Sequence, residues 1–448
     1  MNSKSTETVG AWKDAADRSR GITRRRDFIP PLAAIAVLTV AHLLSGATQP
    51  IATLVLSASL LGCAVASLVL AGPRQVTTGM MVGMVLVWTL ALTGFISSPD
   101  KAAPELASLF AAGAMWSIGY ICARSRGALD IAWTALILSS FGYCIMIFFS
   151  QASAVLSSTG QVTIADAFRT PAEASLMFGL LAVVGWSRVL HVLKQMDAKA
   201  LARSAMIDHL LRHGLGGILL MAFSLTCLAA VGSLVGAIFI AATMIGHAWW
   251  DLHAILERTH RSILMRILAR LAPLVALGLA GWGVYLAWFH DESVALGVGL
   301  SETPPHVQRF MAYFDAWLER PLQGYGIGSI ESVGDRATTL WNAKAMLAPG
   351  GAQNVFLHWL VEAGAIGAGA IILIIAAIYF QIFTALGSKG MPRTFLRLAV
   401  AAGVFLLLHG ISDTSLDIPS IAWLYALLLG AACGVATSRR SDRFGAIA

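Results

Sequence analysis

The sequence predicts an all-α, polytopic membrane protein with about twelve transmembrane helices. Of its 448 residues, 57% are hydrophobic and only 12% are charged, and the mean hydropathy is +0.74. A soluble globular protein has about 25% charged residues and about 45–50% apolar ones. The apolar residues also gather in long runs. Disordered proteins, disulfide-stapled domains and ordinary soluble enzymes are therefore excluded.

The apolar runs give the individual spans. A helix that crosses a bilayer needs roughly 20 mostly apolar residues. Runs of this kind begin at Phe28, Ile51, Val76, Glu105, Leu129, Pro171, Gly214, Val231, Ala272, Gln353, Phe395 and Pro419. The stretch 214–250 is the ambiguous one, because it fits either one overlong helix or two short helices with a turn near 230–233.

The distribution of positive charge resolves this ambiguity. Short loops rich in Lys and Arg stay in the cytoplasm. With two helices in 214–250, all but six of the 31 Lys and Arg residues fall on one side of the membrane; the six are Lys101, Arg169, Arg309, Arg320, Arg336 and Lys344. A single helix would place the arginines of 258–270 on the other side. We therefore predict two helices, and we assign the net charge of +7 to topology, with no nucleic-acid partner.

These spans define the predicted organisation of the chain. Residues 1–27 form a basic cytoplasmic tail, residues 28–436 form the transmembrane domain, and residues 437–448 form a second cytoplasmic tail. No cleavage site follows the first apolar run, so we interpret that run as a retained anchor. Residues 290–352 form one large periplasmic loop between the ninth and tenth helices. Long ordered loops in compact proteins are usually functional, so we expect the site there.

An amphipathic helix is predicted early in this loop. It begins after the prolines at 304–305 and ends at Pro321, with apolar residues recurring every three or four positions. Such a helix lies on the membrane or on the helix bundle, which would hold Arg309 near the lipid headgroups. The glycines that follow, Gly324, Gly326 and Gly328, favour either a tight turn or a nest of backbone N–H groups that binds an anion.

A second candidate group lies where the chain re-enters the membrane. Asn354, His358 and Glu362 are spaced by four, so they share one helical face. A Glu and a His one turn apart can form a general-base pair. The alternative is a hydrogen-bonded interfacial cluster beside a Gly-x-x-Gly helix contact.

No metal site or disulfide is predicted. The five cysteines all fall inside apolar runs, and no His/Cys group has the spacing of metal ligands. We therefore predict no metal and no cofactor.

The order of these features resembles the O-antigen ligase and O-antigen polymerase superfamily of bacterial membrane glycosyltransferases. The resemblance is carried by an arginine on an aromatic helix, the stretch ERPLQGYGIG at 319–328, and a family pattern of His, Asn/Ser/Gln, nine residues and Gly-x-x-Gly. Here Gln353, Asn354, Gly364 and Gly367 fill that pattern. The segment HGISDTSLDIPS from His409 is similar to the family's closing segment. The motifs cover roughly residues 305–430, and the architecture covers the whole chain.

One departure from the family concerns the chemistry. The motif histidine, which the family is thought to use in catalysis, is Gln353 here, and an amide accepts no proton at neutral pH. His358 and His306 are the substitutes that the sequence offers. His358 lies about 140° around a helix from position 353, so it does not occupy the same face.

The resemblance implies a metal-independent glycosyl transfer at the outer face of the bacterial inner membrane. The donor is an oligosaccharide on undecaprenyl diphosphate, and the acceptor is another glycan or the lipid A core. Arginines suit the leaving diphosphate because the guanidinium makes paired hydrogen bonds, and we rank them Arg309, Arg169, Arg320. Gln353, His358 and Glu362 are the candidate catalytic residues. The candidate substrate-binding residues are the three arginines, Asn354, Gly326 and Gly328.

Membrane lipids and other polysaccharide-assembly proteins are further predicted partners. The departure from the ligase-like histidine motif gives polymerase a slight preference over ligase. Two other classes of protein remain alternatives. One is a secondary transporter, because twelve spans with a basic central loop fit a two-half carrier. The other is a non-catalytic member of a polysaccharide-assembly complex, for which the missing motif histidine is the support.

Overall fold

The protein is an all-helical, membrane-embedded chain. The computed structural model describes residues 28–71, 99–157, 168, 170–195, 203–258, 263–289, 305–346, 351–387 and 393–444. Every regular element in these ranges is helical, as the sequence predicts. Ten of the described helices are long and apolar enough to cross a membrane, and a further apolar helix has 15 residues. The span predicted from Val76 lies outside the described residues.

The order of the helices follows the predicted spans closely. In chain order they are α2 (Ile29–Leu43), η2 (Ser45–Ala47), α3 (Pro50–Ala71), α5 (Pro99–Cys122), α6 (Arg126–Ser157), α7 (Pro171–Gln195), α8 (Arg203–Val231), α9 (Leu234–Arg258), α10 (Ile263–Phe289), α11 (Pro305–Glu319), α12 (Ile330–Ala337), α13 (Ala343–Met346), α14 (Val355–Leu386), α15 (Arg393–Gly410), η6 (Ser415–Asp417) and α16 (Pro419–Phe444). The helix turn predicted near 230–233 is confirmed. Gly232 adopts a φ of 74° there, between α8 and α9.

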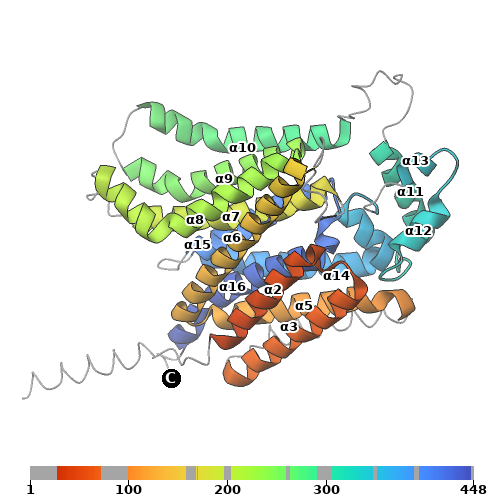
Figure 1. Cartoon of the computed structure of the whole chain (residues 1–448), viewed down its shortest axis with the longest axis horizontal. Helices are drawn as coiled ribbons and strands as arrows, with labels where there is room; N and C mark the ends of the chain where they lie inside the picture. The colour runs from red at the N-terminus through yellow and green to blue at the C-terminus, as the bar shows by residue number, and fades with distance from the viewer. Residues whose placement is uncertain are drawn as a thin grey trace, which may run out of the picture.

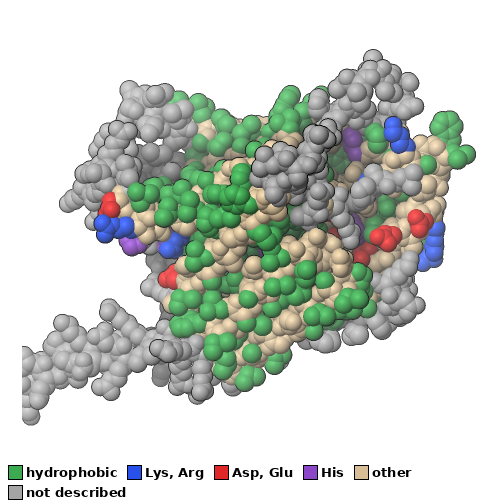
Figure 2. Space-filling view, viewed as in Figure 1, with side chains coloured by type: hydrophobic (Ala, Val, Ile, Leu, Met, Phe, Trp, Pro, Cys, Tyr) green, Lys and Arg blue, Asp and Glu red, His purple; other side chains and the backbone are tan. Residues whose placement is uncertain are grey.

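The long helices lie side by side, and the short helices α11, α12 and α13 stand together at one end of the bundle (Figure 1). We call these three helices the cap, the end of the bundle that carries them the cap end, and the opposite end the far end. Hydrophobic side chains cover the middle of the face in Figure 2, and the charged side chains of that face lie nearer its two ends. This distribution is typical of a protein whose middle lies in lipid.

Three helices form the centre of the bundle. In α7, 78% of the most apolar stretch is buried inside the protein, and in α15 and α16 the fraction is 72%, whereas in α10 it is only 11%. Small residues allow the helices to approach closely. A Cβ on Gly119 of α5 would lie 2.3 Å from the carbonyl oxygen of Leu427 in α16, and one on Gly430 would lie 2.0 Å from that of Trp116. Close contacts of this kind drive helix association in membranes, and they fix α5 against α16.

The far end holds a buried ionic group. Asp251 of α9 pairs with Lys194 of α7 and with Arg397 of α15, and its side chain is fully buried. Arg397 also donates to the carbonyl oxygen of Trp250, at 3.0 Å. The group therefore ties three helices together at one end of the bundle.

Replacing Asp251 with asparagine is expected to lower the free energy of unfolding by about 3 kcal/mol, because two half-buried cations lose their counter-ion. Asp208→Asn is the matched control, since Asp208 pairs with Arg212 at 2.9 Å on the exposed surface, where an ion pair contributes about 0–1 kcal/mol. Thermal unfolding of the two purified variants in detergent checks the difference. Equal melting temperatures for both variants would contradict it.

Candidate functional site

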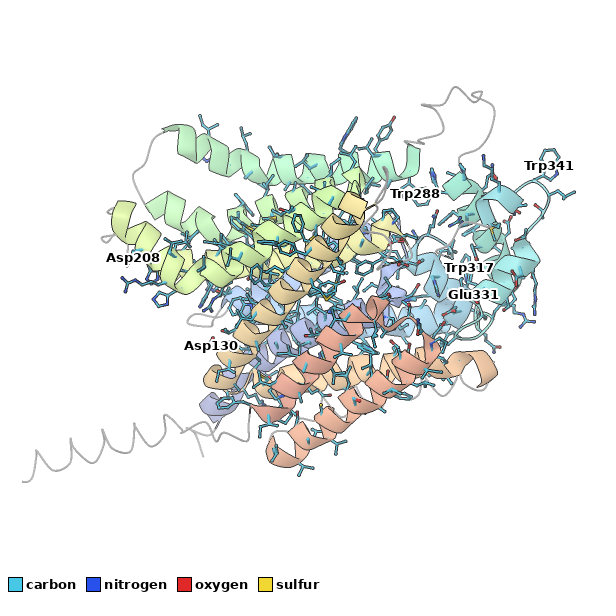
Figure 3. The ribbon with its side chains drawn as sticks, in the orientation of Figure 1. Asp130, Asp208, Trp288, Trp317, Glu331 and Trp341 are labelled. Carbon is cyan, nitrogen blue, oxygen red and sulfur yellow. The ribbon has the colours of Figure 1, made fainter. Side chains whose placement is uncertain are left out.

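The cap is packed onto the bundle through aromatic and aliphatic side chains. Trp288 at the end of α10 contacts Phe310 of α11, with 5.1 Å between ring centroids. Figure 3 shows Trp288 beside the cap and Trp341 at the tip that lies farthest from the bundle. A small hydrophobic core joins α11, α12 and the start of α14; its buried members are Tyr313, Ile330, Val333, Ala352, Leu357 and Val361. The amphipathic helix predicted in the loop is thus confirmed, and it packs on its neighbours in the chain.

The helix that carries the predicted motif is interrupted at Gly364. This residue has φ 63° and ψ −177°, so α14 consists of a short segment before Gly364 and a long one after it. The segment 321–328 enters the break. The N–H groups of Tyr325 and Gly326 donate to the carbonyl oxygens of Val361 and Glu362, each at 2.8 Å. Beyond the break, Ala365 and Ile366 donate to the carbonyl oxygens of residues 321 and 322.

This exchange of hydrogen bonds explains why the break is tolerated. An interrupted helix leaves backbone groups without intrahelical partners, and such groups are costly at the depth of a membrane unless protein satisfies them. The inserted segment supplies those partners. It also requires glycine on both sides, because a Cβ on Gly324 would lie 2.5 Å from the Glu362 carbonyl oxygen and one on Gly364 would lie 2.3 Å from that of Leu322.

The glycine-rich segment binds the carboxylate of Glu362, a side chain of the same protein. Oε1 of Glu362 accepts from the N–H of Gly328 at 3.0 Å and from the N–H of Ile330 at 3.3 Å. Gly326 uses its own N–H for the backbone of Glu362. Of the three glycines predicted as an anion nest, Gly328 thus donates to the Glu362 carboxylate, together with Ile330, and charge-assisted bonds of this type are the strong ones.

His358 lies between two carboxylates. Its Nε2 is 3.4 Å from Oε2 of Glu362, one turn away on α14, and its Nδ1 is 2.8 Å from Oδ2 of Asp417 in η6. The side chains of His358 and Glu362 are each 8% exposed, whereas that of Asp417 is 35% exposed. Both nitrogens of the imidazole ring therefore lie within ion-pair distance of a carboxyl oxygen. The accessible acid of this group is therefore Asp417, with a buried histidine behind it.

A fourth titratable residue reaches the same place from α5. Glu105 interacts electrostatically with Glu362, His358 and Asp417, and its carboxyl group is hydrogen-bonded to the backbone of Gly328. The residue is exposed. We call Glu105, His358, Glu362 and Asp417 the acidic cluster.

The two amide residues of the motif have distinct environments. Gln353 is half-buried and has a φ of 51°, a left-handed conformation that is uncommon for a residue with a side chain. Asn354 caps α14, accepting from the N–H of Leu357 at 2.9 Å, and it donates to the carbonyl oxygen of Ile411 at 2.9 Å. Asn354 thus links the motif helix to the segment between α15 and α16 that carries Asp417.

Of the predicted arginines, the two in the described part of the chain do not converge on one point. Arg309 is buried within the cap, where its guanidinium donates to the carbonyl oxygen of Ala345 in α13. Burial lowers the pKa of this guanidinium from its usual value, and neighbouring Tyr313 opposes that shift. Arg320 is exposed and lies 4.9 Å above the ring of Tyr325. Arg169 lies outside the described residues. Nε2 of His306 is hydrogen-bonded to the carbonyl oxygen of Trp288, at the end of α10. The hydrogen bond does not involve the acidic cluster.

No group of three or more His, Cys, Asp and Glu residues in the described part of the chain could hold a metal ion. All five cysteines are free thiols.

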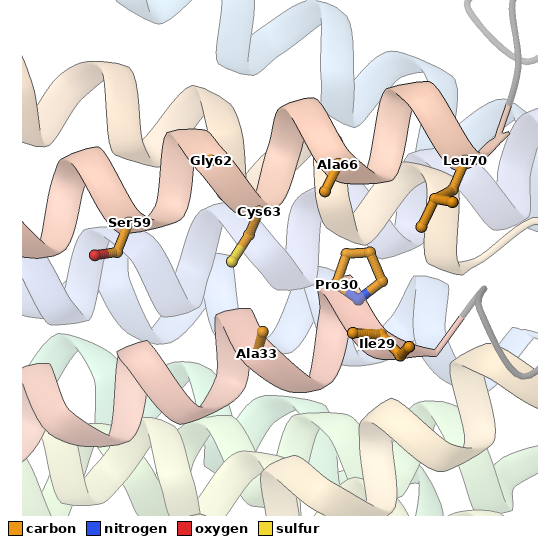
Figure 4. Close-up of a pocket in the computed structure, with 8 residues that line it drawn as sticks. All are labelled: Ile29, Pro30, Ala33, Ser59, Gly62, Cys63, Ala66 and Leu70. Atoms are coloured by element: carbon orange, nitrogen blue, oxygen red, sulfur yellow. The ribbon is translucent and has the colours of Figure 1, made fainter.

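A groove of about 570 Å³ lies between α2 and α3, and no member of the acidic cluster lines it (Figure 4). Its walls are apolar apart from Ser59; they are formed by Ile29, Pro30, Ala33, Ser59, Gly62, Cys63, Ala66 and Leu70. None of these lining residues has a charged side chain.

No known family matches the chain, and no curated protein matches it in sequence. The structure brings His358, Glu362, Gly326, Gly328 and Asn354 together and leaves Arg309 and Arg320 in separate environments.

Sequence reasoning missed two members of the acidic cluster. Asp417 lies in the closing segment that resembles the family, two residues before the proline that begins α16. That position could have marked it as a candidate site residue. Glu105 marks the start of an apolar run and has no motif around it. Only the fold brings its helix to the loop.

Proposed function

We propose that this protein is a membrane glycosyltransferase of the O-antigen polymerase or ligase type. It transfers or polymerises oligosaccharides carried on undecaprenyl diphosphate at the periplasmic face of the bacterial inner membrane. The charge distribution supports this orientation, because the positively charged loops of the twelve-span arrangement would lie in the cytoplasm together with both termini. The cap end then faces the periplasm, where the lipid-linked donor and the acceptor are both present.

The single observation that carries the proposal is the pairing of Asp417 with His358 at the cap end. A glycosyl transfer needs a base to take the proton of the acceptor hydroxyl as its oxygen attacks the sugar. Asp417 is an exposed acid of the cluster, and its Oδ2 lies 2.8 Å from Nδ1 of His358. In the proposed step the hydroxyl proton passes to the Asp417 carboxylate, the new C–O bond forms, and the diphosphate leaves with the electron pair of the broken bond.

Other residues of the site have supporting roles. Arg320 is an exposed arginine directly before the segment that enters the helix break, and we assign it to the diphosphate. Arg309 joins α11 to α13 and acts by holding the cap. Gln353 occupies the place of the family histidine and binds a sugar hydroxyl through its amide. The polymerase keeps the slight preference over the ligase that the motif gives it.

Deleting the protein from its host is expected to cause lipid-linked single repeat units to accumulate, because chain growth would stop. Electrophoresis and mass spectrometry of the lipid-linked glycans measure this. Long lipid-linked chains beside unmodified acceptor would identify a ligase instead. If neither pool changes, the glycosyltransferase proposal is wrong and the carrier alternative takes its place.

A further inference from the structure

The position of Glu105 follows from the packing of α5 against the loop. Ala102 and Leu106 are buried on α5, and Ile327 packs against them. Positions 102, 105, 106 and 109 lie on one face of a helix, so Glu105 is directed toward the segment 324–328. Because α5 is fixed against α16 through Gly119, the carboxyl group has a defined place beside the site.

Glu105 and Glu362 approach the same backbone amide. The N–H of Gly328 donates to Oε1 of Glu362 at 3.0 Å, and the carboxyl group of Glu105 is hydrogen-bonded to the same residue. Glu105 and Glu362 interact electrostatically; when both are charged they repel each other, and a shared proton relieves that repulsion. Glu362 is buried whereas Glu105 is exposed, so the pair connects a buried acid with the surface.

The four residues of the cluster therefore form a chain with accessible ends. It runs from exposed Asp417 through buried His358 and buried Glu362 to exposed Glu105. Between the ends, the contacts are 2.8 Å from Asp417 to His358 and 3.4 Å from His358 to Glu362. The titratable groups that face Glu105 in the described chain are the other three members, from α14 and η6.

We propose that Glu105 shares a proton with Glu362 and is the residue through which the acidic cluster releases protons to the outside. Each proposed transfer frees one proton from the acceptor hydroxyl. Asp417 passes this proton to Nδ1 of His358, and the imidazole ring releases the proton on its Nε2 to Glu362. Glu362 passes a proton to Glu105, and Glu105 releases it to water. Glu105 acts through Glu362, so it is a positioning residue, and its catalytic part rests on the proposed function.

Infrared spectroscopy of the purified protein tests the shared proton without any assay of activity. The wild type is expected to show the C=O band of a protonated carboxylic acid at neutral pH, and Glu105→Gln is expected to lose it. Glu331→Gln is the matched control, because Glu331 is an exposed acid of α12 (Figure 3) and its replacement should leave the band intact. A wild type without the band, or a Glu105→Gln variant that keeps it, would overturn the proposal.

Transfer kinetics test the release of protons. Glu105→Gln is expected to lower kcat about 10- to 100-fold with little change in KM and to alter the pH profile, whereas Glu105→Asp should restore most of the rate. An unchanged kcat and pH profile would overturn this part. If the wild type shows no transfer at all, the proposed function fails, while the infrared result still decides whether the proton is shared.

Discussion

Replacing Gly364 with alanine is expected to destabilise the protein by at least about 3 kcal/mol. The backbone conformation of Gly364 is available almost only to glycine, and strain of this kind costs of order 1–3 kcal/mol. The new Cβ would also lie 2.3 Å from the carbonyl oxygen of Leu322. The segment 321–328 would have to leave the helix break, which would disconnect the backbone of Gly328 from Glu362.

Gly369→Ala is the matched control for this prediction. Gly369 lies five residues further along the same helix, and a Cβ there would meet nothing within 4 Å. Thermal unfolding and the amount of monodisperse protein recovered in detergent measure the difference. Two variants of equal stability would mean that the inserted segment is not needed to hold α14.

Replacing Asp417 with asparagine is expected to lower the rate of the proposed glycosyl transfer by about 10²- to 10⁴-fold, because we propose Asp417 as its general base and a general base usually contributes that much. Asparagine keeps the size of the side chain but accepts no proton. Because the backbone N–H of Asp417 donates to the carbonyl oxygen of Thr414, η6 should keep its shape. Transfer from a lipid-linked donor to a glycan acceptor by the purified variant measures the rate.

The control here is Asp315→Asn, on the exposed surface of α11, which should retain the wild-type rate. Protein level and melting temperature of both variants should match the wild type. A fully active Asp417→Asn variant would remove Asp417 from the site and leave Glu362 and His358 as the remaining candidates for the base.

The sequence predicted the helices well because each one depends on a local property. A run of apolar residues long enough to cross a bilayer must satisfy its backbone internally, and a helix does so within the run itself. The predicted starts at Pro171 and Pro419 agree with the structure to the residue. The turn between α8 and α9 was found from charge, because the arginines that follow it belong on one side of the membrane.

The motif was predicted only in part. His358 and Glu362 were correctly placed on one helical face, since spacing alone determines this. The break at Gly364 was not expected; the Gly-x-x-Gly pattern instead favoured a contact with a neighbouring helix. Glycines are common in membrane helices, so the pattern alone gives no sign that another segment replaces the helical hydrogen bonds.

The sequence by itself determined that this is a helical membrane protein, where its helices lie and where the motif falls. It could do so because hydrophobicity and helical periodicity act over a few turns of chain. Tertiary structure alone decided which side chains make the site. Glu105, Gly328, His358 and Asp417 come from four separate segments, and no local pattern links them. They meet because glycine contacts fix α5 against α16 and because the inserted loop binds both the broken helix and the carboxylate of Glu362.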